Sequence, residues 1–227
     1  MYEAIPVKEL PFQPASVTFV DEDFVSLSKY FGSDIIVEPY YFNKGFKGFS
    51  EDLYVRRGVA ERLELAMTYL PYGFTFKVYD AWRPIKVQKS LYNAYVKQLM
   101  KTKKYTKEEA HEEAKIFVSV PTLDELYPAV HSTGGAIDLT LAEKKSKIEL
   151  NMGCEFDSFD KKSYSAYFES ATDVEACTNR RLLYNAMISA GFTNLPSEFW
   201  HYDYGDSNWA YYKKQPAKYR GMLYLNS

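Results

Sequence analysis

The hydrophobic and polar positions of the chain change their period several times, and each change predicts a different element. Apolar residues recur at spacings of three and four over residues 51–70, the pattern of a helix packed on one face. From Phe74 to Asp80, apolar and polar residues alternate, which predicts a strand. Pro84 suits the start of a further helix over about 84–100, because the first helical position needs no backbone N–H donor.

The second half of the chain shows a similar mixture of patterns. Thr106 and Glu109 have the spacing of a capping box, in which each side chain bonds the backbone N–H of the other residue, and they predict a helix over about 107–118. The other elements predicted here are a strand over 135–141, a helix over 179–190 and a short aromatic strand over 199–202.

The order of these elements indicates the class of fold. The chain before residue 48 is irregular, with strand-like pieces at 17–20 and 34–37 and a turn at 45–48. Because strands and helices mix without regular β–α–β alternation, the pattern favours an α+β domain with a mainly antiparallel sheet over a doubly wound fold. No internal repeat or flexible linker divides the sequence, so we predict a single domain over residues 1–227.

Composition and charge narrow the range of partners. The 28 basic and 30 acidic residues give a net charge of −2, and no basic block predicts contact with nucleic acid. No stretch approaches the roughly 20 apolar residues that a membrane span requires. The aromatic content of 17%, with 21 tyrosines, is typical of an aromatic core and a groove lined by polar tips. The sequence specifies no oligomeric state.

The N-terminus and the cysteines bear on the compartment. Residues 1–4 lack the basic and apolar stretches of a signal peptide, so we expect a cytoplasmic protein as written; a periplasmic or secreted location requires that a signal peptide has been removed. Cys154 and Cys177 are the only cysteines. They could pair, as in an exported protein, or remain free, and two cysteines alone cannot form a zinc site.

Two of the three histidines lie in patterns that suit metal ligands. If residues 135–141 form a strand, Asp138 stands on the face opposite its apolar neighbours, beside small residues that leave space around its carboxylate. The glycine pair before this strand lets the chain fold His131 back toward Asp138. An imidazole and a carboxylate placed in this way suit zinc, although a His–Asp hydrogen bond in a turn explains this segment equally well.

His201 favours the interpretation as a metal site. With His131 and Asp138 it completes the three protein ligands of a catalytic zinc, which keeps one position for water. Glu198, three residues earlier, is the natural acceptor for a proton of that water. Residues three apart in an ideal strand point to opposite faces, so this role requires a bend near Glu198, which Pro196 can provide. The alternative is a surface carboxylate beside an aromatic strand.

The remaining candidates are weaker when taken alone. Arg83 follows one predicted strand and precedes a helix, where a fixed guanidinium could bind an oxyanion or a substrate carboxylate. The simpler explanation for Arg83 is an ion pair with Asp80. His111 lies on a helix face rich in Lys and Glu, so we predict a solvated side chain.

Five segments carry the candidate residues in a fixed order: DAWRP (80–84), HSTGGAIDLTL (131–141), MGCEFD (152–157), NRRLL (179–183) and EFWHY (198–202). Together they resemble the D-alanyl-D-alanine dipeptidases, the VanX-like branch of the zinc D,D-peptidases. The resemblance spans about residues 80–202, and a weaker match over 40–48 extends it toward the N-terminus. A lone His-x6-Asp pattern would be weak, but its combination with Glu-x-x-His and the Arg-Pro pair is specific.

The resemblance implies a fold and a mechanism. The family has a central antiparallel sheet flanked by helices, shared with D,D-carboxypeptidases and the hedgehog signalling domain. The resemblance implies one Zn²⁺ per chain, bound by His131, Asp138 and His201. It assigns Glu198 as general base and then acid, and Arg83 as the group that stabilises the tetrahedral intermediate.

The resemblance also implies how a small dipeptide substrate is held. Asp157 corresponds to an aspartate that binds the free amino group of the substrate, and Tyr40 to a tyrosine near the same end. A buried charge left unpaired costs on the order of 3–5 kcal/mol. Asp157 would therefore exclude longer peptides that lack an amine at this place.

The expected function is that of a zinc-dependent dipeptidase that hydrolyses D-alanyl-D-alanine to two D-alanines. One alternative is a zinc D,D-carboxypeptidase or endopeptidase acting on peptidoglycan stem peptides, against which Asp157 and a helical insertion at about 101–128 argue. Another alternative is a non-enzymatic, zinc-stabilised binding module on the same fold. The presence of both Glu198 and Arg83 disfavours it.

Two positions depart from the pattern of the family. Ala129 stands where a serine that contacts the substrate carboxylate is common, so this carboxylate must be bound otherwise, by Ser132 or Thr133. Cys154 stands where a small polar residue is more usual. A disulfide between Cys154 and Cys177 would brace the loop that follows.

Overall fold

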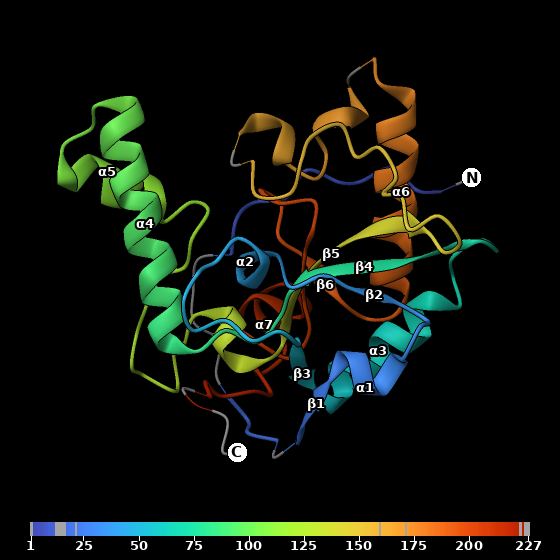
Figure 1. Ribbon diagram of the computed structural model, residues 1–227, viewed down its shortest axis with the longest axis horizontal. Coiled ribbons are helices and arrows are strands. Elements are labelled where there is room, and N and C mark those ends of the chain that lie inside the picture. Colours follow the sequence, from blue (N-terminus) through green and yellow to red (C-terminus); the bar gives the residue numbers. More distant parts are fainter. Residues whose placement is uncertain are drawn as a thin grey trace.

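A five-stranded sheet forms the centre of the structure (Figure 1). The computed structural model describes residues 2–11, 17–20, 22–158, 160–170, 172–222 and 224. In spatial order the strands are β2 (Ile36–Val37), β4 (Phe74–Asp80), β5 (Ala136–Glu143), β7 (His201–Asp203) and β6 (Thr193–Asn194). The β2–β4 pairing is parallel, and the other three pairings are antiparallel. The predicted α+β class with a mainly antiparallel sheet is therefore confirmed.

The register of the three central strands brings polar residues together at one end of the sheet. Between Val78 and Asp80 the β4–β5 register shifts, and Asp80 becomes the partner of Asp138. Such an irregularity re-aims the side chains that follow it. On the other side of β5, Asp138 is the partner of His201. The sheet thus places Asp138 between a residue of β4 and a residue of β7.

The opposite face of β5 anchors the hydrophobic core. Its residues Ile137, Leu139 and Leu141 are fully buried, as the alternation in the sequence predicts. They share this core with Leu63 of α3 (Arg57–Met67) and Leu183 of α6 (Val174–Ser189). Because these helices are held by the apolar face, the polar face of β5 remains available for a site.

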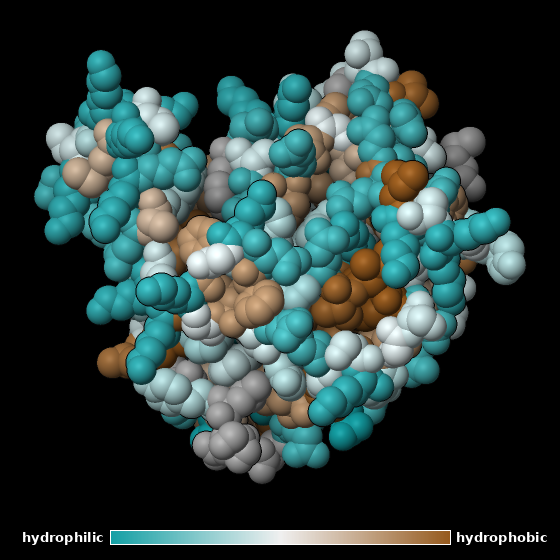
Figure 2. All heavy atoms as spheres, in the orientation of Figure 1, coloured by the Kyte–Doolittle hydropathy of each residue, from teal (hydrophilic) through white to brown (hydrophobic). Residues whose placement is uncertain are grey.

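Helices α4 (Ile85–Lys103) and α5 (Lys107–Ala114) form an arm beside this body (Figure 1). The predicted capping box is present, because the Thr106 hydroxyl accepts from the Glu109 backbone and the Glu109 carboxylate accepts from the Thr106 backbone. The arm has its own small core, made by Tyr92 and Leu99 of α4 and Ala110 of α5 among others. Its outer surface is largely hydrophilic (Figure 2).

The remaining elements are short. They are β1 (Phe24–Ser26) and β3 (Tyr54–Arg56), which form a two-stranded sheet, helices α1 (Leu27–Phe31), α2 (Tyr40–Asn43) and α7 (Ser207–Lys213), and the 3-10 turns η1 (Val130–Thr133), η2 (Lys161–Ser163) and η3 (Tyr167–Glu169). Within the described ranges, no helix combines the length and apolar character needed to cross a bilayer.

Several of the predicted boundaries were wrong. The helix predicted over 107–118 ends at Ala114. The helix predicted over 51–70 begins at Arg57, because residues 54–56 pair with β1 as strand β3. The helix predicted over 179–190 begins at Val174, where the Asp173 carboxylate accepts from the Ala176 backbone N–H at 2.9 Å. The strand predicted over 199–202 begins only at His201, after a turn.

Two smaller expectations, a strand over 17–20 and a disulfide, are not confirmed. Residues 17–20 bond along residues 217–218, through Thr18 N to Ala217 O at 2.8 Å and Val20 N to Lys218 O at 2.9 Å, without forming an assigned strand. Cys154 and Cys177 are both free thiols, so the disulfide considered from the sequence is not formed.

Candidate metal centre and active site

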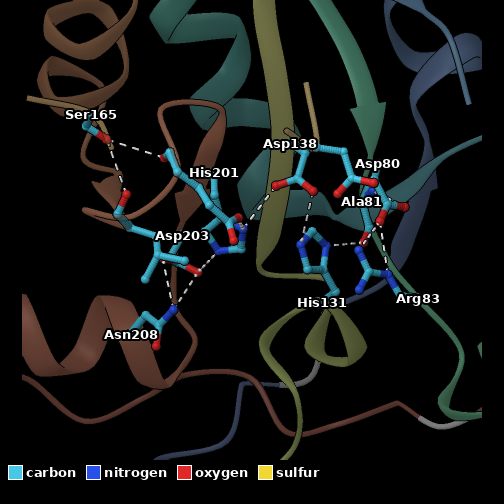
Figure 3. A network of polar contacts seen from close by, with 12 residues as sticks. Asp80, Ala81, Arg83, His131, Asp138, Ser165, His201, Asp203 and Asn208 are labelled. Atoms are coloured by element: carbon cyan, nitrogen blue, oxygen red, sulfur yellow. Dashed lines mark hydrogen bonds and ion pairs between the residues drawn. The ribbon is translucent and has the colours of Figure 1, made fainter. Parts of the chain in front are cut away.

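Three side chains converge at the polar end of the sheet: His131 from η1, Asp138 from β5 and His201 from β7 (Figure 3). All three are buried, with exposed fractions of 6%, 3% and 2%. Each offers one ligand atom, and these atoms lie within 4.8 Å of one another. The structure therefore brings together the three residues that the sequence singled out.

The orientation of His131 is fixed from behind. Its Nδ1 lies 2.7 Å from the carbonyl oxygen of Ala81, and a carbonyl only accepts, so Nδ1 carries the hydrogen. The other nitrogen, Nε2, then faces the centre and lies 3.4 Å from Asp138 Oδ2. A backbone carbonyl that fixes the tautomer of a histidine in this way is typical of metal ligands.

His201 is also fixed by a hydrogen bond from behind, but here Nε2 makes that bond and Nδ1 faces the centre. Its Nε2 lies 2.8 Å from Asp203 Oδ1, and its Nδ1 lies 3.0 Å from Asp138 Oδ1. Asp203 is fully buried and also accepts from the Asn208 side chain at 3.3 Å. Asp203 thus holds the outer side of the ring and leaves Nδ1 directed toward the centre (Figure 3).

The charges around the group favour a cation. Burial alone would raise the pKa of Asp138, but the adjacent His131 and His201 hold it well below its usual range. Burial lowers the pKa of His201, whereas Asp203 and Asp138 raise it, and the net effect is a pKa well above the ordinary value. Protons and a metal therefore compete for the same place. Two imidazoles and a carboxylate fit zinc with one position left for water.

Glu198 lies in the turn that leads into β7. The turn lets its side chain approach that of His201, although residues three apart in an ideal strand point to opposite faces. The Glu198 backbone N–H donates to Leu195 O at 3.2 Å, and the His201 N–H donates to Glu198 O at 3.3 Å. The carboxylate is buried, with Oε2 3.9 Å from His201 Nδ1. Its other oxygen, Oε1, has no hydrogen-bond partner among the described residues. A buried oxygen of this kind calls for a polar ligand in the site.

The electrostatics of Glu198 suit proton transfer. The pKa of Glu198 is raised to about 8, chiefly by burial; His201 and Arg83 lower it, and Asp138 and Asp157 add to the rise. A dication on the neighbouring ligands would lower this pKa, because it favours the ionised form. Glu198 is therefore a group that can both accept and return a proton near neutral pH.

Arg83 is buried and engaged on two sides. Its Nε donates to Asp80 Oδ2 at 3.0 Å, its Nη2 donates to the same oxygen, and its Nη1 donates to Gln88 Oε1 at 2.8 Å. The ion pair with Asp80 considered from the sequence is thus present, and the guanidinium also lines the cavity described below. Ser132 is buried and donates its hydroxyl to Arg83 O at 2.9 Å, so its side chain supports the backbone there.

A cavity of about 250 Å³ joins these groups. Arg83, Glu198 and the three candidate ligands line it on the side of the sheet, and helix α4 and residues 115–119 line it from the arm. This volume lies below the roughly 300–1,000 Å³ of sites for drug-sized ligands. This small volume favours a small substrate.

Asp157 enters the cavity from the loop after β5. It is half-buried, with a backbone φ of 64°, and its Oδ1 accepts from the Tyr41 hydroxyl at 3.1 Å. Tyr41, not Tyr40, is among the residues that line the cavity. The ring of Tyr40 instead packs edge-on against Phe156, with centroids 4.8 Å apart. Neighbours on a helix point about 100° apart, so the sequence alone could not distinguish the two tyrosines.

Other residues occupy supporting positions. Asp203 and Gln88 were not anticipated from the sequence, although Asp203 lies two residues after His201 on a strand and thus on the same face. Ala129 is buried at the start of η1. His111 lies outside the site, half-buried, with Nδ1 3.1 Å from the Tyr92 hydroxyl and its ring stacked on that tyrosine. It is thus packed rather than solvated.

A buried His–Asp–His group beside a buried glutamate and a fixed arginine is typical of a metal-dependent hydrolase. The comparisons with known proteins agree. A family model described as D-ala-D-ala dipeptidase, Peptidase_M15, matches residues 49–220. The chain therefore belongs to this family of peptidases and is a metallopeptidase.

Individual relatives share smaller parts of the chain. The D-alanyl-D-alanine dipeptidase of Synechocystis sp. is 29% identical over an alignment of 181 residues, which covers 71% of this chain and 73% of that protein. The D-alanyl-D-alanine dipeptidase of Escherichia coli is 33% identical over 132 residues, or 58% and 55% of the two chains. Among solved structures, VanYB in complex with D-Alanine-D-Alanine is similar with a TM-score of 0.47 and 17% identity, covering 74% of this chain and 83% of that chain.

Proposed function

We propose that this protein is a zinc-dependent dipeptidase that hydrolyses D-alanyl-D-alanine to two D-alanines. The observation that carries the proposal is the convergence, in one small cavity, of the His131–Asp138–His201 group, Glu198 and Arg83, with Asp157 at its wall. One Zn²⁺ per chain would be held by His131 Nε2, His201 Nδ1 and the Asp138 carboxylate. When bound, zinc supplies a Lewis acid for the water and the peptide carbonyl oxygen.

The side chains of the protein provide the proton transfers. Glu198 accepts a proton from the attacking water as its oxygen forms a bond with the peptide carbonyl carbon. Glu198 then delivers this proton to the leaving nitrogen as the C–N bond breaks. Arg83 donates hydrogen bonds to the carbonyl oxygen as negative charge develops on it. Because Asp80 and Gln88 already hold the guanidinium, little reorganisation is needed during the reaction.

The length of the substrate is limited by the charge of Asp157 as well as by the volume of the cavity. Asp157 would pair with the ammonium of the first D-alanine, and Tyr41 would share its Oδ1. A longer peptide has an uncharged amide at that place and leaves the half-buried carboxylate unpaired, which disfavours binding. The cavity volume of about 250 Å³ also favours a short substrate.

The test is a comparison of two substrates under controlled metal content. Turnover of D-Ala-D-Ala should far exceed turnover of a pentapeptide that ends in D-Ala-D-Ala, and stoichiometric zinc should restore the activity of metal-free protein. Preference for the pentapeptide would instead assign a carboxypeptidase or endopeptidase. Absence of any hydrolysis by the zinc-loaded protein would reject the enzymatic proposal.

A further inference from the structure

Gln88 joins two parts of the active-site cavity without lining it. It lies in the first turn of α4 and is buried, with an exposed fraction of 1%. Its Oε1 accepts from Arg83 Nη1 at 2.8 Å, and its Nε2 donates to the backbone carbonyl of Ser119 at 2.7 Å. The amide thus has both of its ends occupied, and the two residues that it contacts, Arg83 and Ser119, both line the cavity.

The contact with Arg83 completes the constraint on the guanidinium plane. Asp80 accepts from Nε and Nη2 through a single oxygen, Oδ2, so the pair is not the two-oxygen fork that fixes a guanidinium most firmly. When both bonds end on one oxygen, the guanidinium plane can still tilt about that oxygen. Gln88 removes this tilt by holding the third nitrogen, and the ring of Tyr41 lies 5.4 Å from the guanidinium carbon.

The contact with Ser119 connects this guanidinium to the arm. Residues 115–119 follow α5 and form one wall of the cavity. Their position is set by the arm core, to which Val118 and Tyr92 of α4 contribute. Because Gln88 contacts both Arg83 and Ser119, a shift of this wall would reach Arg83 through a single side chain.

We propose that Gln88 is a positioning residue, which holds Arg83 at the angle required for the developing oxyanion and ties that angle to the position of the 115–119 wall. This inference rests on the proposed role of Arg83. Gln88 does not touch the substrate, so its removal should reduce kcat and leave KM nearly unchanged. A displacement of a catalytic group by about 1 Å can reduce the rate on the order of 100-fold.

The experiment compares variants of the zinc-loaded protein with D-Ala-D-Ala as substrate. Gln88→Met keeps the side-chain length and removes both contacts, and we expect kcat about 10- to 100-fold below wild type with KM within about twofold. Gln88→Glu keeps an acceptor for Arg83 but cannot donate to Ser119, and it should recover a large part of the lost rate. Thr75→Val is the matched control, because Thr75 is equally buried and donates to the Asp34 carbonyl at 2.6 Å, at the opposite end of β4. It should lower thermal stability without changing kcat.

A double-mutant cycle separates positioning from general destabilisation. In an Arg83→Lys background there is no guanidinium to orient, so Gln88→Met should lower kcat by less than about twofold. An equal loss in both backgrounds, or a Gln88→Met protein with wild-type kcat, overturns the inference. If Arg83→Lys alone keeps wild-type turnover, the proposed role of Arg83 itself fails. A large loss in Arg83→Lys with none in the Gln88 variants refutes only the role of Gln88.

Discussion

Replacement of Asp157 by asparagine should abolish recognition of the substrate amino group while the fold is retained. Asp157 has a φ of 64°, in the left-handed region that asparagine adopts more readily than most residues. An asparagine carbonyl oxygen can also accept the bond from the Tyr41 hydroxyl. The change therefore removes the charge with little disturbance of the loop.

The structure sets the scale of this effect. Burial raises the pKa of Asp157 to about 7, while Tyr41 and Arg83 lower it and Asp138 and Asp80 raise it. Relative to the ordinary value of 3.8, this rise corresponds to an upper limit of ~4 kcal/mol against the ionised carboxylate in the empty site. A substrate ammonium compensates this penalty. We expect kcat/KM for D-Ala-D-Ala to fall at least about 100-fold in Asp157→Asn, the lower end of the scale for an uncompensated buried charge.

The same carboxyl group should contribute to two pH dependences. Only the ionised form pairs with an ammonium, so kcat/KM of the wild type should rise as pH increases toward about 7, and Asp157→Asn should lack this contribution. For folding, a pKa raised in the native state gives a contribution that is fully present at pH below 3.8 and lost as pH rises through about 7. Asp157→Asn should therefore be more stable than wild type at about pH 8, by no more than a few kcal/mol, and less so at about pH 5.

The assay measures kcat/KM for D-Ala-D-Ala and for its N-acetylated form between about pH 5.5 and 8.5. Wild type should reject the acetylated substrate, and Asp157→Asn should process both at similar low rates. Glu155→Gln is the matched control, because Glu155 is exposed in the same loop and the substitution removes the same charge. An Asp157→Asn protein with wild-type selectivity and pH profile would refute the reasoning.

Two further substitutions test the proton transfers and the metal group. Glu198→Ala should keep its zinc and lose at least about 100-fold in kcat, the usual scale for a general base; metal analysis with turnover measurements checks this, and a fully active variant would remove Glu198 from the mechanism. Asp203→Asn should weaken zinc binding about 10- to 100-fold, because Asp203 orients His201 from behind. Competition with a chelator measures this affinity, and an unchanged value would show that Asp203 does not orient the ligand.

The parts of the fold that follow from local pattern were predictable. The alternation over 74–80 corresponds to strand β4 residue by residue, and the capping box at Thr106 marks the true start of α5. The predicted helix over 51–70 failed at its start, because Val55 fits a helical period equally well. Its assignment to a strand depends on pairing with β1, more than 25 residues away in sequence.

The candidate site shows the same division. The residue types and motif spacing singled out His131, Asp138, His201 and Glu198, all of which line one cavity. The groups that orient them are supplied by tertiary structure, such as the Ala81 carbonyl behind His131. No local pattern predicts this contact, because Ala81 and His131 lie 50 residues apart in the sequence.

The central claim is that a metal held by the His131–Asp138–His201 group drives hydrolysis of D-Ala-D-Ala. Metal analysis combined with a D-alanine release assay, with and without a chelator, tests it most directly. We expect about one zinc per chain, loss of activity when the chelator removes it, and recovery on addition of zinc. Turnover of D-Ala-D-Ala that persists in protein shown to be free of metal would contradict the claim.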